Sequence, residues 1–301
     1  MLSKKILRLL TIINVLSAHK NGLSKHDLIK IIERKFELSN ESFNYKDITF
    51  KRDIIDIRTE LQIDIIYSRK NDTYCLNSLE INDSRIDLLL NSMAVFSTFL
   101  NHSGLPKYIL TDKRQTSGLD NFAAISDAIK KGHKVEFSYF KFDSNLFETK
   151  KICPLALKES KKRWYVIGVY DFNQEIKAFG LDRISNLTIT DTRFKSAIDI
   201  DTIYSYYEHS FAMFTDANKE RVTLKFDLTD GNYIKSYPIH RSQKIELNDE
   251  KNAYIVSLEI KITLDLVMEL MSRAWSIEII EPQSLRQRLQ NIFQDASLRN
   301  K

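Results

Sequence analysis

Residues 45–61 combine hydrogen-bonding and cationic side chains in a pattern that could read duplex DNA. Phe50, Ile54, Ile57 and Leu61 are spaced by four, three and four residues, which predicts a helix with one apolar face. Polar groups in the first turns of a helix in the major groove reach base edges, and flanking cations contact phosphates. The side chains predicted to contact DNA are Tyr45, Lys46, Ile48, Thr49, Lys51 and Arg52.

A short basic hairpin is predicted to follow this helix. Two runs of β-forming residues, 63–68 and 73–77, flank a turn that contains Arg69 and Lys70. We expect these two cations to contact DNA as the wing of a winged helix-turn-helix. The alternative is a generic three-helix domain whose polar face is only solvated.

Two amphipathic helices are predicted before the recognition helix. Residues 3–18 have apolar positions at helical spacing, and Ser24 with Asp27 forms a capping box for a second helix. We therefore expect residues 1–78 to form a winged helix-turn-helix DNA-binding domain.

The sequence contains no motif for catalysis or metal binding. Its seven glycines form no GxG or GxxxxGK, and its six histidines form no HExxH and no pair with metal-ligand spacing. Cys75 and Cys153 form no CxxC, so neither a disulfide framework nor a thiolate metal site is expected. We expect no catalytic residue, metal or cofactor; an enzyme whose active site has no known motif is the alternative.

Composition indicates a multidomain globular chain. The chain has 301 residues, 43% hydrophobic and 28% charged, which suggests two or three folded domains. The apolar stretch 86–100 is interrupted by polar residues and is too short to span a membrane. The first residues are basic and then apolar, but their spacing suits an amphipathic helix better than a signal peptide. We expect a cytoplasmic protein with no membrane partner.

Basic charge is concentrated in two segments. Residues 1–76 carry fourteen Lys or Arg against ten acidic residues, and residues 130–163 carry ten against four, within a net charge of +5. This pattern predicts two anion-binding surfaces. The alternative for the second segment is that lysine-rich hairpins only keep a sheet edge soluble.

A linking segment and a small antiparallel barrel are predicted in the middle of the chain. Residues 81–100 read as one long helix within a linking segment, 79–119, which could pair across a dimer or simply pack. A helix at 120–131 precedes several short strand-like runs with turns between them, typical of a small barrel over 120–192. The runs are 134–142, 146–152, 155–158, 163–170 and 175–190, the last open to a split in two.

Four short motifs in this region resemble the WYL domain family, whose members sense ligands behind a winged helix. They are Phe137-Ser138-Tyr139, Lys150-x-x-x-Pro154, Trp164-Tyr165-Val166 and Phe179-x-Leu181-Asp182-Arg183. The resemblance implies an Sm-like barrel. Lys150 stands where the family usually has arginine. Its ammonium group would therefore bind a phosphate as a point charge and not through the two parallel hydrogen bonds of a guanidinium group.

The resemblance also implies a ligand surface lined by Tyr139, Lys150, Tyr165 and Arg183. These groups suit a nucleotide or a single-stranded nucleic-acid fragment, because cations neutralise phosphate and aromatic faces stack on bases. Trp164 is expected in the core. For Tyr165 and Arg183 a structural role stays open, for Arg183 as the partner of Asp182 or another carboxylate.

The first domain resembles the DeoR-type winged helix found in front of WYL domains. The match rests on Ile48-Thr49-x-x-Arg52-Asp53, on Ile57 and on Tyr74-x-Leu76. Lys46 and Ile48 replace residues typical of that family, so the DNA sequences that the family recognises do not predict the operator of this protein.

Residues 193–301 are predicted to form a third domain. The order over 221–281 is βαββαβ, which is ferredoxin-like, and a helix follows at 283–298. The segment resembles the extension C-terminal to WYL domains, which is implicated in dimerisation and in closing over the ligand. His240 and Arg286 would then touch ligand or partner; a capping or salt-bridge role is the alternative.

The prediction is thus an α+β multidomain, homodimeric, ligand-responsive regulator of transcription. It would bind double-stranded operator DNA and respond to a nucleotide or single-stranded nucleic acid. The alternative is a nucleic-acid-binding accessory or sensor of a phage-defence system, with the winged helix used for protein docking.

Overall fold

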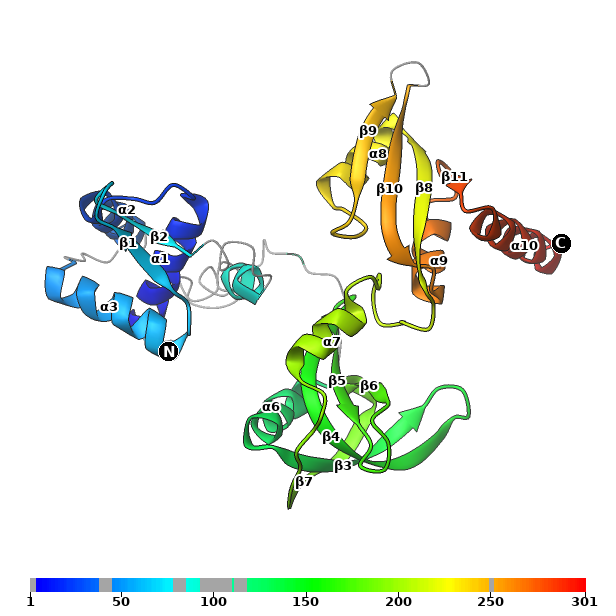
Figure 1. The fold of residues 1–301 in the computed structure, drawn as a ribbon, viewed down its shortest axis with the longest axis horizontal. Coiled ribbons are helices and arrows are strands. Elements are labelled where there is room, and N and C mark those ends of the chain that lie inside the picture. The colour runs from blue at the N-terminus through cyan, green and yellow to red at the C-terminus, as the bar shows by residue number, and fades with distance from the viewer. Residues whose placement is uncertain (1–3, 38–44, 78–84, 93–109, 111–117, 249–251) are drawn as a thin grey trace. The chain divides into compact units, whose positions relative to one another are not determined.

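The computed structural model describes the chain except residues 1–3, 38–44, 78–84, 93–109, 111–117 and 249–251. The chain divides into two compact units, Met1–Lys113 and Arg114–Lys301. It is an α+β fold that begins with helices, and its described strands form antiparallel sheets (Figure 1).

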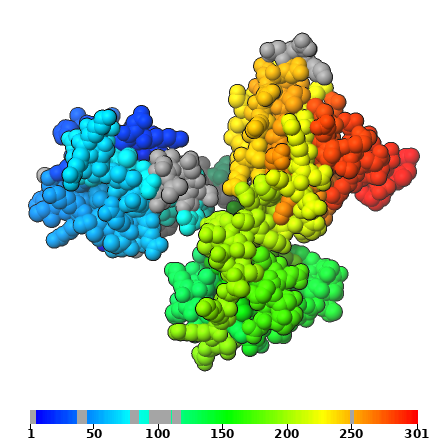
Figure 2. All heavy atoms as spheres, viewed as in Figure 1, coloured from blue at the N-terminus to red at the C-terminus, as the bar shows by residue number. Residues whose placement is uncertain are grey.

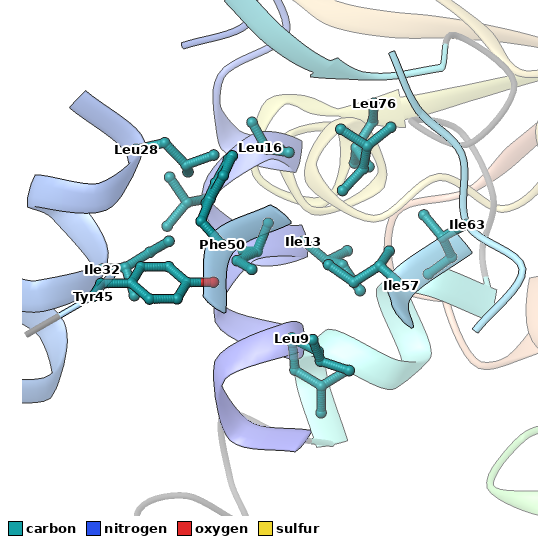
Figure 3. Close-up of a cluster of buried hydrophobic side chains, with 14 of the residues drawn as sticks. Leu9, Ile13, Leu16, Leu28, Ile32, Tyr45, Phe50, Ile57, Ile63 and Leu76 are labelled. Atoms are coloured by element: carbon teal, nitrogen blue, oxygen red, sulfur yellow. The ribbon is translucent and has the colours of Figure 1, made fainter. Parts of the chain in front are cut away.

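The first unit consists of three helices and a two-stranded hairpin around one apolar core. The core receives Leu9 and Ile13 from the first helix, Leu28 from the second, and Phe50 and Ile57 from the third (Figure 3). The elements are α1 (Lys4–Ala18), α2 (Lys25–Glu37), α3 (Asp47–Glu60), β1 (Ile65–Ser68) and β2 (Thr73–Leu76). The predicted periodicity therefore placed all three helices on their correct buried sides.

The start of α2 confirms the predicted cap. The Asp27 backbone N–H donates to Ser24 Oγ at 3.1 Å, which satisfies one of the free amides of the first turn. Next to it, Leu23 and Tyr74 exchange backbone hydrogen bonds of 2.9 and 2.8 Å and so attach this turn to the hairpin.

Part of the predicted linking helix is described. Residues 85–92 are helical, and Ile86 is buried in the core of the first unit. The remainder of the predicted helix 81–100 lies outside the described residues.

The second unit begins with a helix and five antiparallel strands. The strand order is β6-β5-β4-β3-β7. The elements are η1 (Leu119–Asn121), α6 (Phe122–Lys131), β3 (His133–Lys141), β4 (Leu146–Ser160), β5 (Arg163–Val169), β6 (Ile176–Gly180), η2 (Leu181–Arg183) and β7 (Ile184–Arg193). The run 175–190 is split in two, because the short helix η2 interrupts it.

The prediction of two strands in 146–158 is wrong. Both runs belong to the single strand β4, whose first half pairs with β3 and whose second half pairs with β5. The register shifts between Pro154 and Ala156, where the proline has no N–H to donate. The proline therefore marks a change of partner within one strand rather than a turn between two.

A helix that was not predicted, α7 (Ile200–Tyr207), connects the barrel strands to the last domain. Asp199 begins it, since its Oδ1 accepts the Thr202 N–H at 2.8 Å. Atoms of this segment, yellow-green in Figure 2, lie against the green atoms of the barrel, and Lys158 of β4 lies over the Tyr207 ring.

The C-terminal part has the predicted order of strand, helix, strand, strand, helix, strand and helix. Its sheet order is β11-β8-β10-β9, and apolar residues of α8 and α9 share one core with the strands. The elements are β8 (Lys219–Asp227), α8 (Leu228–Ser236), β9 (Lys244–Asn248), β10 (Ala253–Lys261), α9 (Leu264–Met271), β11 (Glu278–Glu281) and α10 (Gln283–Arg299).

Candidate functional site

The outer side of α3 is exposed over its whole length. Phe50 and Ile57 anchor the inner side in the core, whereas Lys51 and Arg52 are exposed and Ile48 is 68% exposed. Thr49 is partly exposed, and Lys46, the residue before the helix, is exposed. The helix therefore presents a row of cationic, polar and apolar side chains away from the core.

The cations of this surface differ from the other cations of the unit in their ion pairing with the described residues. Elsewhere in the same unit Arg8 pairs with Asp53, Lys25 with Asp47, and Arg58 with Asp64 at 3.0 Å. The structure gives no ion pair with any described residue to the five predicted DNA-contacting cations, which are Lys46, Lys51, Arg52, Arg69 and Lys70. A group of unpaired cations favours binding of a polyanion, because phosphates relieve the mutual repulsion.

The prediction that Tyr45 lies on this exposed surface is wrong. Because α3 begins only at Asp47, helical spacing does not apply to Tyr45, and its side chain turns into the core (Figure 3). It is 4% exposed, and its hydroxyl donates to the Asp53 carboxylate. Burial, and then Asp53, raises the pKa of Tyr45.

Asp53 is the centre of a buried network that joins α1 to α3. Its side chain is 1% exposed, and its Oδ1 accepts from Arg8 Nη2 at 2.7 Å. The Arg8 Nε and the Tyr45 hydroxyl both donate to Oδ2. This role was not predicted from the sequence. The signal was present, because Asp53 lies three residues after Phe50 and four before Ile57, which places it on the apolar side of the helix.

A second apolar side chain on the outer side of α3 was also missed. Ile55 is 58% exposed and lies seven residues, or about two turns, after Ile48. The two isoleucines therefore share the side of the helix on which Arg52 lies between them.

In the barrel, Arg183 packs on aromatic rings rather than on a carboxylate. Its Cζ lies 4.7 Å from the centroid of the Tyr139 ring and 4.6 Å from that of Phe142, and both distances are typical of cation–π contacts. Asp182, the other candidate partner of Arg183, instead accepts from Arg163 Nη1 at 2.9 Å.

Tyr139 and Tyr165 are largely enclosed. Tyr139 is buried, its hydroxyl accepts the Gly180 N–H at 3.3 Å, and burial raises the pKa of this hydroxyl. Tyr165 pairs with Gly180 in the β5–β6 ladder and is partly exposed; burial raises its pKa. Gly180 is thus close to Tyr139, Tyr165 and Arg183. The Tyr139 ring is covered by Arg183 and is not an exposed stacking surface.

Lys150 lies in a different hollow of the barrel. Its ammonium group pairs with Glu148, and the hydrogen bond to Glu148 raises the pKa of Lys150. The Glu148 carboxylate also pairs with Lys141 at 3.1 Å. A pocket of about 480 Å³ is lined by Lys150, Tyr170 and Phe172 but not by Tyr139, Tyr165 or Arg183.

Two aromatic side chains beside Lys150 were missed by sequence analysis. Tyr170 and Phe172 are stacked, with centroids 5.1 Å apart and planes at 12°, and Phe172 is exposed. An exposed aromatic face beside a cation is suited to a nucleobase attached to phosphate.

His240 anchors the end of α7. Its Nε2–H donates to the Glu208 carbonyl at 2.9 Å, and burial lowers its pKa. Nearby, Lys261 Nζ donates to the Tyr206 carbonyl at 3.1 Å, and Arg241 pairs with Glu208 at 2.6 Å. The geometry is that of helix capping, the alternative considered for His240, and His240 lines a pocket with Lys158 and Tyr207.

Arg286 also makes backbone contacts, to the carbonyls of Ile279 at 2.7 Å and Ile280 at 2.8 Å. Within the described ranges no group of three or more His, Cys, Asp or Glu could hold a metal ion. Of the helices that are described, none is long and apolar enough to cross a bilayer.

Comparison with known families assigns two of these regions. The model of the WYL domain matches residues 120–189, and that of the WCX domain matches residues 218–297. The chain therefore contains a WYL domain followed by a WCX domain, and the resemblance of residues 120–189 to WYL domains is confirmed.

Two solved structures are similar over most of the chain. Proteasome accessory factor B/C (PafBC) of Arthrobacter aurescens shares 17% identity with a TM-score of 0.35, over 94% of this chain and 45% of that one. A CRISPR Cas-related protein shares 11% identity with a TM-score of 0.39, over 97% and 84%. The chain thus spans less than half the length of PafBC, and no curated protein matches it.

Proposed function

We propose that this protein is a DNA-binding transcription regulator that responds to a ligand and acts by binding rather than by catalysis. The first unit would bind double-stranded operator DNA, and the WYL domain would bind a nucleotide or a short nucleic-acid fragment. The observation that carries the proposal is the group of cations on and around α3 that form no ion pair with the described residues, beside the ion-paired cations of the same unit. We place the protein in the cytoplasm, as a homodimer.

The arrangement of elements supports a specific fold for each domain. Three helices followed by a β-hairpin are the elements of a winged helix, and five antiparallel strands after a helix fit an Sm-like barrel. The order β11-β8-β10-β9 is the order that a ferredoxin-like βαββαβ unit produces. In this proposal α3 is the recognition helix and the β1–β2 turn is the wing.

Regulation requires that the ligand bind one state of the protein more tightly than another. The barrel offers two surfaces for a nucleic-acid ligand: Arg183 on its aromatic rings, and Lys150 beside Tyr170 and Phe172. Both combine a cation with aromatic faces, which suits a phosphate attached to a base.

A second candidate function is an accessory or sensor protein of a defence system. The exposed Ile48 and Ile55 favour it, because apolar side chains on the outer side of α3 would suit docking to a protein. In that case the barrel would bind single strands, and the first unit would not prefer duplex DNA.

Fluorescence anisotropy separates the two candidates. Purified protein is titrated with duplex from upstream of its own gene, with unrelated duplex as competitor and at two salt concentrations. Specific, salt-sensitive binding that is lost in Arg52→Ala, and kept in the control Lys131→Ala, is expected for the regulator. Binding of single strands only, dependent on Lys150 and Arg183, would show the accessory protein instead.

A further inference from the structure

A basic cavity lies where the turn between β4 and β5 meets the C-terminal domain. Its volume is about 520 Å³, within the range of small-molecule sites. Residues of the barrel form one side, and residues such as Phe211 and Tyr237 form the other. The charged residues that line it are four cations, Lys158, Lys161, Lys162 and Arg273, and two carboxylates, Glu159 and Glu269.

Lys158 is the most enclosed of the three lysines. Its Nζ lies 5.2 Å from the centroid of the Tyr207 ring, and burial lowers the pKa of its ammonium group. Among the residues that the structure describes, no carboxylate forms an ion pair with it. Lys158 is half-buried, and an ammonium group that is partly removed from water without an ion-pair partner would gain from an anionic ligand.

The carboxylates near Lys158 are occupied by other donors. Asp265 Oδ2 accepts the N–H groups of Met213 at 2.8 Å and Phe214 at 3.1 Å, and Oδ1 accepts that of Leu266 at 2.9 Å. Glu159, which also lines the cavity, accepts the Lys162 N–H at 2.7 Å. Both carboxylates thus accept backbone hydrogen bonds, and among the described residues neither forms an ion pair with Lys158.

The turn that carries two of the lysines has an unfavourable conformation for them. Lys161 and Lys162 have φ of 48° and 64°, a left-handed two-residue turn in which asparagine and glycine are preferred. Lysines cost stability here, and such departures from local preference concentrate at functional sites. The Lys161 ammonium lies 4.7 Å from the Phe211 ring centroid and 3.6 Å from Glu269.

Arg273 contributes a further unused donor. Its Nη1 donates to the buried Asp230, while its Nε is buried and has no acceptor among the described residues. Its Nη2 lies 3.7 Å from Glu269, so what the guanidinium group adds to the cavity is positive charge on its wall.

We propose that this cavity binds a phosphate-bearing small molecule, held by Lys158, Lys161, Lys162 and Arg273. Several cations around one cavity suit a group with several charged oxygens better than a single carboxylate. The site differs from the barrel surfaces at Arg183 and Lys150, and it does not depend on the proposed binding of DNA. Because its walls come from both domains, bound phosphate would hold the barrel against the C-terminal domain.

Isothermal titration calorimetry of the full chain tests the proposal, with phosphate, pyrophosphate and adenosine monophosphate as separate probes. Saturable binding of at least one is expected, weakened about tenfold or more by Lys158→Met, which keeps length and removes charge. The matched control Lys177→Met changes an exposed lysine of β6 and should bind as the wild type. Preference for pyrophosphate or for the monophosphate would distinguish an inorganic ligand from a nucleotide.

A second variant keeps the test decisive if Lys158→Met does not fold. Lys161→Asn with Lys162→Gly places preferred residues in the turn, so it should melt at a higher temperature and yet bind more weakly. The proposal is overturned if none of the probes binds saturably at millimolar concentration. It is equally overturned if the folded Lys158→Met protein, or the turn variant, binds as tightly as the wild type.

Discussion

Replacing Arg8 by methionine should selectively destabilise the first unit. Arg8 donates to both oxygens of the Asp53 carboxylate, whose side chain is 1% exposed. Methionine retains the apolar contacts of the arginine stem but leaves the carboxylate without its cation. The helix that carries the proposed DNA surface, α3, would lose its main polar attachment to α1.

The size of the effect follows from the burial of the pair. Removing one partner of a buried ion pair costs about 3–5 kcal/mol, and because the Arg8 side chain is 14% exposed we expect about 3 kcal/mol. Tyr45→Phe removes one hydrogen bond to the same carboxylate and should cost about 1.5–3 kcal/mol. In Arg8→Met with Asp53→Leu no uncompensated charge remains, so most of the loss should be recovered.

Native-state hydrogen exchange measures this change where it occurs. Peptides from α1 and α3 report the free energy of opening of the first unit, and peptides from β8 and β10 of the other unit serve as an internal control. Faster exchange should be confined to the first group in Arg8→Met. A change below about 1 kcal/mol there, or a double variant no more stable than Arg8→Met, would refute the reasoning about the buried pair.

Three further predictions concern the other surfaces. Arg52→Ala should weaken binding of the operator by about 1–3 kcal/mol. Lys51→Ala should weaken binding of all duplexes alike and should lower by about one the slope of log binding constant against log salt concentration. Fluorescence anisotropy at several salt concentrations measures both effects, and identical behaviour of the two variants would contradict the prediction. Gly118 has φ of 95°, and a Cβ there would lie 2.3 Å from the backbone of η2, so Gly118→Ala should lower the free energy of unfolding by about 2 kcal/mol or more. Gly132→Ala is the control: its φ of 67° is unfavourable, but the nearest atom to an added Cβ is 3.6 Å away, so a cost of only about 1 kcal/mol is expected. Urea unfolding followed by tryptophan fluorescence compares the two variants. Equal losses of stability would count against a steric clash at Gly118. Burial lowers the pKa of Lys158 in the folded protein below its ordinary 10.5. Between the folded and unfolded pKa values the unfolded chain binds more protons, so thermal stability should rise with pH in that window. Lys158→Met should abolish that part of the rise, and an unchanged pH profile would show that Lys158 does not cause the rise.

Local patterns in the sequence were sufficient for most of the secondary structure. The spacing of apolar residues located α1, α2 and α3, and Ser24 with Asp27 marked the start of α2. The WYL domain was recognised from short motifs whose side chains lie within a few residues of one another. These features depend on neighbours along the chain, which the sequence displays directly.

Errors arose where the outcome depends on distant residues. Helical spacing was extended to Tyr45, but the hydrogen bond to Asp53 and the contact with Phe50 bring that ring into the core. The runs 146–152 and 155–158 were taken as two strands, whereas β3 and β5 pair with the two halves of one strand. In both cases the deciding partner comes from tertiary packing or from another strand, and local preference does not report it.

The sequence by itself determined the order of the modules, the WYL motifs and the basic character of α3, because periodicity, turn residues and charge are local properties. Only the tertiary structure decided which cations are free. Arg8 is bound to Asp53 and Arg183 rests on Tyr139, while Arg52 is exposed and Lys158 is half-buried over the Tyr207 ring with no ion pair to a described residue. The physical reason is that the free energy of a charge depends on burial and on partners many residues away, and these exist only after the chain has folded.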